Sequence, residues 1–324
     1  MLAILLGLLV GSIVGSRDSL SAGISGSSSF PLRAAVVVLG AQLPLQTVVT
    51  EGVRSLPVIA LTLGACLLAA RALGRALSIP NPLRTLVGVG TGICGASAIA
   101  AVTPVIEAGE LDVGYAVATI FLFNVLAVLT FPPLGHLIGM SAGAFGLFAG
   151  TAVNDLSSVV ATASAYSGSL HTAVIVKLAR TLMIVPISIV LGMLHRRGSQ
   201  LSARARTDGE TPASRRRPAS RRLLRESPGD RLAAVGESLQ LMPRFLIGFL
   251  LLAALRSVNL IPHAVAPASG EAATLLITIA LAAVGLSIDI KALRDTGPRP
   301  ILLGAGLWVT VTAVSLTAQG LGLG

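Results

Sequence analysis

Residues 86–108 read LVGVGTGICGASAIAAVTPVIEA and decide how this chain folds. The stretch is apolar enough to lie in a membrane, but it is a poor continuous helix. It holds four glycines within eight residues: Gly88, Gly90, Gly92 and Gly95. Each glycine in a helix interior costs about 1 kcal/mol relative to alanine. We therefore expect the helix to be interrupted before Pro104, with Ser97 capping a second half-helix.

A second stretch of the same kind is FGLFAGTAVNDLSSVVATASAYS at 145–167. Here Gly146 and Gly150 precede Asn154 and Asp155, two residue types that favour helix N-caps. Irregular backbone at membrane depth is stable only where protein or a water-filled cavity satisfies its polar groups. The N-terminal ends of the half-helices would then favour anions. The alternative reading of each stretch is close packing of helices through small residues.

The composition extends this interpretation to the whole chain. Of its 324 residues, 53% are apolar and 12% are charged, whereas soluble domains carry about 25% charged residues. Apolar stretches long enough to cross a bilayer, which takes about 20 residues, recur along the chain. We predict ten membrane spans: 1–15, 33–49, 54–77, 83–106, 113–136, 142–165, 170–194, 242–261, 271–290 and 300–321. The fold class is therefore an all-α polytopic membrane protein.

Five spans fall on each side of residue 139, which predicts two repeats, 1–139 and 140–324. An odd number of spans in each repeat would invert one repeat relative to the other, a common plan in transporters. Lys and Arg gather in alternate loops, above all in the 195–241 loop with its run RRRPASRRLLR. The positive-inside rule then places this loop in the cytoplasm. It explains most of the net charge of +10 without a nucleic-acid partner.

Three of the ionisable residues in the predicted spans are candidates for a charged site. Lys177 and Arg180 are three residues apart and therefore share a helical face. A charge near the membrane midplane costs at least ~2.5 kcal/mol and normally faces a cavity or a partner. Asp155 is the expected partner. One reading is an anion site with a coupling ion on Asp155, and the other is a structural ion pair in which Asp155 acts mainly as a cap.

We expect the substrate-binding residues to come from both interrupted spans and the spans beside them: Thr91, Cys94, Ser97, Asn124, Asn154, Ser157, Ser158, Lys177 and Arg180. Arg180 could bind sulfate or sulfonate oxygens with two parallel N–H bonds. Asp155 would hold a proton or a sodium ion. The four histidines stand at segment ends, so no metal site is expected, and no other cofactor is indicated. No catalytic motif is present, so we do not expect an enzyme.

These motifs, with VKLARTLMIVPISIVLGML at 176–194 and ALAAVGLSIDIKALRDTG at 280–297, resemble the YeiH-type family of conserved membrane proteins known as sulfate exporters. The resemblance implies a bacterial inner-membrane transporter with crossed, broken helices, related in fold to bile-acid and sodium–proton transporters. It would make 83–106 and 271–290 the crossing helices, with 142–165 beginning the second repeat. Relatives usually have His where this chain has Asn154, and often one more N-terminal span, which favours a start upstream of Met1.

The expected function is secondary transport of a small anion through the lipid bilayer. Two alternatives stay open. A cation–proton antiporter would use Asp155 as its ion ligand and Lys177 as a competitor. A non-transporting sensor or scaffold would use the basic 195–241 loop to contact a partner. The sequence leaves the anion, the direction of transport and the oligomeric state open, a homo-oligomer included.

Overall fold

The computed structural model describes residues 30–193, 244–258, 260, 265–286 and 297–323. Within these residues the chain is mostly helical, and no strand occurs among them. The helices follow one another in this order: Phe30–Gly40, α3 (Leu45–Ala76), α4 (Asn81–Gly92), α5 (Ala96–Val102), α6 (Glu110–Leu137), α7 (Ala142–Ala152), α8 (Leu156–Ser164), α9 (Leu170–Leu182), 184–193, α12 (Arg244–Ser257), α13 (Val265–Leu286) and α15 (Pro298–Gly320).

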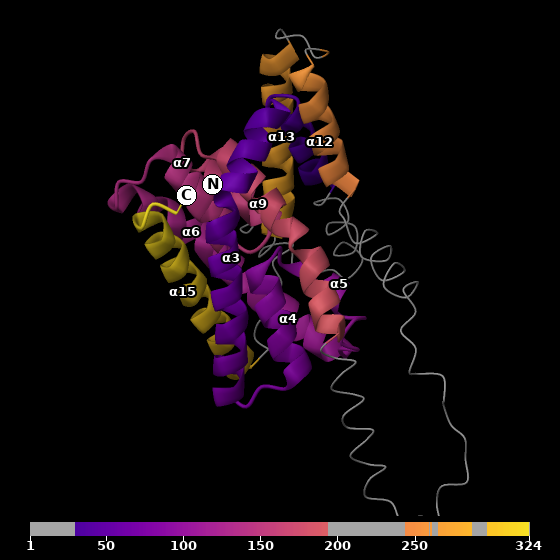
Figure 1. Cartoon of the computed structure of the whole chain (residues 1–324), viewed down its shortest axis with the longest axis vertical. Helices are drawn as coiled ribbons and strands as arrows, with labels where there is room; N and C mark the ends of the chain where they lie inside the picture. The colour runs from indigo at the N-terminus through magenta and orange to yellow at the C-terminus, as the bar shows by residue number, and fades with distance from the viewer. Residues whose placement is uncertain (1–29, 194–243, 259, 261–264, 287–296, 324) are drawn as a thin grey trace, which may run out of the picture.

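The helices form one packed bundle, with α15 lying along the long helix α3 (Figure 1). The main core joins α3, α4, α6, α7 and α15 through buried aliphatic and aromatic side chains. A second cluster joins the helix Phe30–Gly40 and α12 to α8, α9 and α13. Figure 1 shows α12 and α13 standing together at one end of the molecule.

Four of the described helices are long and apolar enough to cross a membrane: α3, α6, Leu170–Met193 and α15. Shorter apolar helices accompany them, among them Phe30–Gly40 and α7. The chain is thus a multi-pass helical protein whose composition suits a bilayer. The count of ten spans, the two repeats and the orientation stay predictions. The first span at 1–15 and most of the 195–241 loop lie outside the described residues.

One predicted boundary is wrong. The sequence placed spans at 33–49 and 54–77, with Glu51 between them and Arg54 at the edge of the second, but both residues lie within α3. The helices separate earlier, at residues 41–44, where Pro44 forms the N-cap of α3 in an extended conformation. Charged side chains that look like a loop in the sequence are tolerated on a helix because long side chains can reach towards water.

Candidate functional site at the junction of two broken helices

The first interruption falls where the glycines predict it. α4 ends at Gly92 and α5 begins at Ala96, so residues 93–95 separate two half-helices. The cap of α5 is Gly95, with φ of 71°, a conformation that glycine adopts without steric cost. The prediction that Ser97 caps this half-helix is wrong, because Ser97 lies within the first turn of α5 with its side chain exposed.

The second interruption separates α7, which ends at Ala152, from α8, which begins at Leu156. Asp155 is the N-cap of α8, and one carboxylate oxygen accepts a hydrogen bond of 2.9 Å from the backbone N–H of Ser158. The capping role predicted for Asp155 is therefore confirmed. A carboxylate at a helix N-terminus also interacts favourably with the positive end of the helix dipole.

The two interruptions lie against each other. A Cβ atom at Gly95 would stand 3.1 Å from the Cβ of Asp155 and 3.6 Å from its Cα. Gly95 thus serves twice, since it provides the positive φ and lets the two backbones approach. We call residues 91–95 and 153–155 together the junction. It brings together segments about sixty residues apart in the sequence.

Lys177 and Arg180 of α9 bind the carbonyl groups of the junction. The Lys177 ammonium donates to the carbonyls of Ile93 and Val153, at 2.7 and 2.8 Å. The Arg180 guanidinium donates to the carbonyls of Gly92, Thr91 and Val153, at 2.6, 2.7 and 3.3 Å respectively. Both side chains are fully buried. They therefore satisfy carbonyls that the broken helices α4 and α7 leave without helical partners.

This arrangement corrects the expected partner of the two cations. Asp155 accepts hydrogen bonds from Asn124, Ser157 and Ser158, and within the described part of the chain no salt bridge joins it to Lys177 or Arg180. The bonds from Ser158 measure 2.9 Å each, from its N–H and its hydroxyl. A carboxylate offers about four lone-pair sites, and these donors fill them. The cations therefore bind the carbonyl side of the junction, and the acid caps the helix on its other side.

Asn124 of α6 stabilises the second interruption from the side. Its side-chain oxygen accepts from the backbone N–H of Asn154 at 3.1 Å, while its amide nitrogen donates to Asp155. Asn124 thus replaces a hydrogen bond that a continuous helix would make. The side-chain oxygen of Asn154 is buried and has no hydrogen-bond partner among the described residues. A buried acceptor of this kind suits a bound water, ion or substrate.

The junction gathers most of the predicted site residues. Thr91, in the last turn of α4, and Cys94, in the first interruption, are buried. Ser157 and Ser158 lie in the first turn of α8. What the sequence did not indicate is the part played by the backbone carbonyls of Ile93 and Val153, which carry no side-chain signature. The resemblance also named 271–290 as a crossing helix. There α13 is a continuous helix to Leu286, and residues 287–296 lie outside the described residues.

The access to the junction is asymmetric. Lys177 and Arg180 are fully buried, whereas Asp155 and Ser157 are partly exposed and Ser97 is exposed. Two cations against one acid leave the junction with one net positive charge. The half-helix dipoles add little to this sum, because two negative C-terminal ends meet two positive N-terminal ends. The junction can therefore attract an anion, while the charged group that water reaches most easily is an acid.

Comparison with known proteins agrees with the resemblance seen in the sequence. The profile of a family described as "Conserved hypothetical protein 698" matches residues 1–213 and 222–304. A UPF0324 membrane protein of Streptococcus agalactiae serotype V is 38% identical over 328 residues, which cover 98% of this chain and 88% of the relative. A UPF0324 membrane protein of Streptococcus pyogenes serotype M18 is 41% identical over 325 residues, with the same coverage of each chain.

A more distant relative, a UPF0324 membrane protein of Fusobacterium nucleatum, is 33% identical over 338 residues and again covers 98% of this chain and 88% of its own. No solved structure matches the chain. The match to the family profile runs through both interruptions and through Lys177 and Arg180. This chain therefore belongs to the YeiH-like family of conserved membrane proteins to which these UPF0324 proteins belong.

Proposed function

We propose that this protein is a secondary active transporter that moves a small anion of the sulfate or sulfonate class by alternating access. The observation that carries the proposal is the junction, where two interrupted helices meet around Lys177, Arg180 and Asp155. Interrupted helices with charged side chains at membrane depth are a recurring plan of substrate sites in transporters.

The two buried cations are the reason for proposing an anion as the substrate. Lys177 and Arg180 now donate to backbone carbonyls, which are neutral acceptors. An anionic acceptor adds Coulomb attraction between two full charges to such hydrogen bonds, and this attraction is stronger in a buried site than in water. An anion that reached the junction would therefore compete for these donors. It would release the carbonyl ends of α4 and α7, so that substrate binding and movement of the half-helices are linked.

Asp155 is the reason for proposing that anion transport is coupled to a proton or a sodium ion. Its carboxylate is held by neutral donors from Asn124, Ser157 and Ser158. Binding of a proton or a sodium ion would remove its negative charge and would change this set of hydrogen bonds. The junction would then carry a larger positive charge and bind an anion more strongly. Anion and cation would thus bind cooperatively, which is the thermodynamic basis of transport of both in the same direction.

The test is flux of labelled sulfate, and then of labelled sulfonates, in proteoliposomes with and without a pH or sodium gradient. We expect gradient-dependent flux for the wild type and little flux for Lys177→Ala/Arg180→Ala. Arg71→Ala, an exposed arginine of α3, is the control. Protein recovered as a monodisperse, helical species is required of every variant. Wild-type flux from the double variant would show that the anion site lies elsewhere.

A cation–proton antiporter is the second candidate, and the asymmetric access favours it. Asp155 is the partly exposed charge of the junction, whereas both cations are buried with donors already used. This alternative predicts sodium–proton exchange in proteoliposomes that contain no permeant anion, and loss of that exchange in Asp155→Asn. Anion flux that depends on Lys177 and Arg180 would favour the anion transporter instead.

A further inference from the structure

Most of the unpartnered polar atoms in the described part of the chain lie on one helix, α15. Among the described residues, five side-chain nitrogen or oxygen atoms are buried without a hydrogen-bond partner. Three of them belong to α15: Trp308 Nε1, Thr312 Oγ1 and Gln319 Oε1. Their spacing of four and then seven residues places them on one face of the helix, and Ser315 lies on the same face between them. We call these four residues the α15 seam.

The α15 seam faces α6 and α7 inside the bundle. The indole ring of Trp308 stacks on the ring of Phe131 in α6, with the ring centroids 5.3 Å apart. The hydroxyl of Ser315 shares a hydrogen bond of 2.7 Å with the hydroxyl of Thr151, in the last turn of α7. The side-chain nitrogen of Gln319 donates to the Ser315 hydroxyl at 3.4 Å. The seam therefore lies between three helices and meets α7 beside the second interruption.

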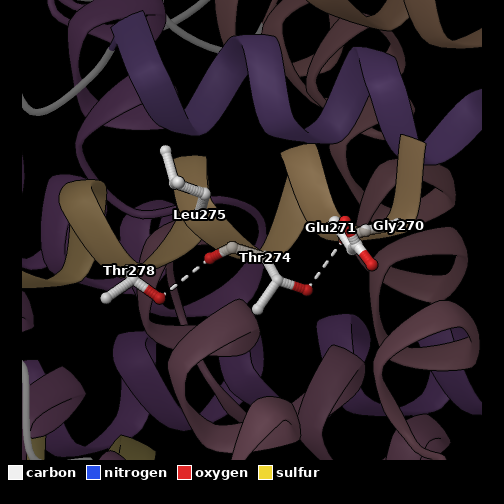
Figure 2. A pocket seen from close by; sticks show the side chains of 5 residues that line it. All are labelled: Gly270, Glu271, Thr274, Leu275 and Thr278. Carbon is white, nitrogen blue, oxygen red and sulfur yellow. Dashed lines mark hydrogen bonds between the residues drawn. The ribbon is translucent and has the colours of Figure 1, made fainter. Parts of the chain in front are cut away.

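Helix α13 shows how threonine hydroxyls are usually satisfied in this protein. The Thr274 hydroxyl donates to the carbonyl of Gly270 at 2.9 Å, and the Thr278 hydroxyl donates to the carbonyl of Thr274 at 2.8 Å (Figure 2). Both threonines are exposed, and so is Glu271 on the same helix. A hydroxyl that bonds to the carbonyl four residues earlier has used its only donor within its own helix. The polar groups of this face therefore need no further partner inside the protein.

Thr312 departs from this pattern within α15 itself. The hydroxyls of Thr310 and Thr317 donate to the carbonyls four residues earlier, at 2.7 and 2.8 Å. The Thr312 hydroxyl is buried and makes no such bond within the described part of the chain. It therefore keeps its donor and its lone pairs for another group. The indole N–H of Trp308, one helical turn earlier on the same face, is open in the same way.

The three open groups complement one another and suit water. The indole of Trp308 offers only a donor, Gln319 Oε1 offers only an acceptor, and the Thr312 hydroxyl offers both. All members of the seam are neutral, so the seam gives no charge to hold an ion. A buried water makes about three hydrogen bonds to polar groups that lack other partners. Such a water can accept from the indole N–H of Trp308 while it bonds to the Thr312 hydroxyl, and another can donate to Gln319.

We propose that the α15 seam binds ordered water molecules between α15, α6 and α7, with Trp308, Thr312 and Gln319 as their ligands. The inference does not depend on what the protein transports. A polar atom left unpaired inside a membrane-embedded bundle is costly, and a water-mediated hydrogen bond is nearly as favourable as a direct one. Through the bond between Ser315 and Thr151, the last turn of α7 is then attached to a hydrated interface.

Trp308 is the only tryptophan of the chain, so the protein labelled with ¹⁵N-tryptophan gives one indole N–H signal, which reports on the seam. We would measure magnetisation transfer from water to this proton by NMR, with the protein in nanodiscs of deuterated lipid. Cross-relaxation in the rotating frame distinguishes a bound water from proton exchange, because the two effects have opposite signs. We expect clear cross-relaxation with water. An indole N–H without it would overturn the proposal.

A soluble gadolinium chelate separates internal water from bulk water. Because Trp308 Nε1 is buried, the chelate should broaden the indole signal far less than the amide signals of exposed loops. Equal broadening would overturn the proposal, since the indole would then face bulk solvent. These measurements use the wild type and do not require that any variant folds.

Thr312→Val tests the assigned ligands, because valine has the shape of threonine without the hydroxyl. Cross-relaxation between water and the indole N–H of Trp308 should fall severalfold. Thr310→Val is the matched control, since the Thr310 hydroxyl already bonds to its own helix, and it should leave the transfer unchanged. The unfolding temperature gives a test of sign. A dry seam predicts that Thr312→Val is more stable than the wild type, because an unsatisfied hydroxyl is removed. A hydrated seam predicts a lower unfolding temperature, so a rise in that temperature would contradict the proposal.

Discussion

The two sides of the junction differ in the backbone groups that the broken helices leave unpaired: carbonyls on one side and N–H groups on the other. On one side, the C-terminal ends of α4 and α7 leave carbonyls without helical donors, and Lys177 and Arg180 satisfy them in complete burial. On the other side, the N-terminal ends of α5 and α8 leave N–H groups without acceptors. There Asp155 caps α8, but no side chain in the described part of the chain caps α5, and the surrounding residues are partly exposed.

This difference indicates that the carbonyl side and the amide side of the junction have different roles. Buried carbonyls in a bilayer must be paired, because each unpaired group costs several kcal/mol, so the carbonyl side is closed and held by fixed charges. The amide side keeps polar groups that a ligand can reach. We therefore expect substitutions on the carbonyl side to lower stability as well as flux, and those on the amide side to act mainly on transport.

Arg180→Ala should have the largest effect on stability. It removes the donors to the carbonyls of Thr91 and Gly92, while Val153 keeps its bond from Lys177. Each buried carbonyl left without a donor typically costs about 1–3 kcal/mol, and this variant leaves two. The unfolding temperature of purified protein should fall sharply, with Arg71→Ala unchanged. Arg180→Lys should recover only part of the loss, since one ammonium group cannot reproduce the planar set of N–H donors of the guanidinium.

An Arg180→Ala protein as stable as the wild type would contradict the division between the two sides. It would mean that water or a rearranged backbone satisfies the carbonyls of Thr91 and Gly92. The guanidinium would then be available to a substrate without any movement of the half-helices.

Asp155→Asn should cost less stability and more transport. Asparagine is as good an N-cap as aspartate, so α8 keeps its cap. Its amide nitrogen, however, would meet the donor groups of Asn124 and Ser158, at a cost of about 1–3 kcal/mol. We expect at least tenfold slower flux and no response to a pH or sodium gradient. Flux in proteoliposomes that keeps its gradient dependence in this variant would remove Asp155 from the coupling step.

Gly95→Ala measures how closely the two breaks approach. The substitution introduces a Cβ at φ of 71° and 3.1 Å from the Cβ of Asp155. Gly139→Ala is the matched control, because Gly139 has φ of 66° and nothing within 4 Å of the added Cβ. Both variants should lose about 1 kcal/mol from backbone strain. Chemical denaturation should show a further loss, and flux a severalfold drop, only for Gly95→Ala; equal losses would mean that the breaks separate easily.

The sequence predicted the interruptions because their causes are local. Glycine crowding before residue 95 and the Asn154-Asp155 pair act on their own segments, and both breaks lie where these residues stand. The partners of Lys177 and Arg180 could not be predicted in the same way. Their acceptors are backbone carbonyls 24 to 89 residues away, and every residue has such a carbonyl. The side chain of Asp155 was therefore the only visible partner, and among the described residues it forms no salt bridge with either cation.

Ser97→Ala should have the smallest effect on stability and tests directly whether the amide side of the junction receives the substrate. Ser97 is exposed, and its hydroxyl makes no hydrogen bond within the described part of the chain, so the unfolding temperature should not change. If the amide side receives the substrate, loss of this hydroxyl should still slow sulfate or sulfonate flux by about twofold to tenfold, the value of one hydrogen bond. Ser164→Ala, an exposed serine in the last turn of α8, is the control and should leave flux unchanged. Equal flux in both variants would exclude Ser97 from the path and would leave the first turn of α8, with Ser157 and Asp155, as the accessible part of the junction.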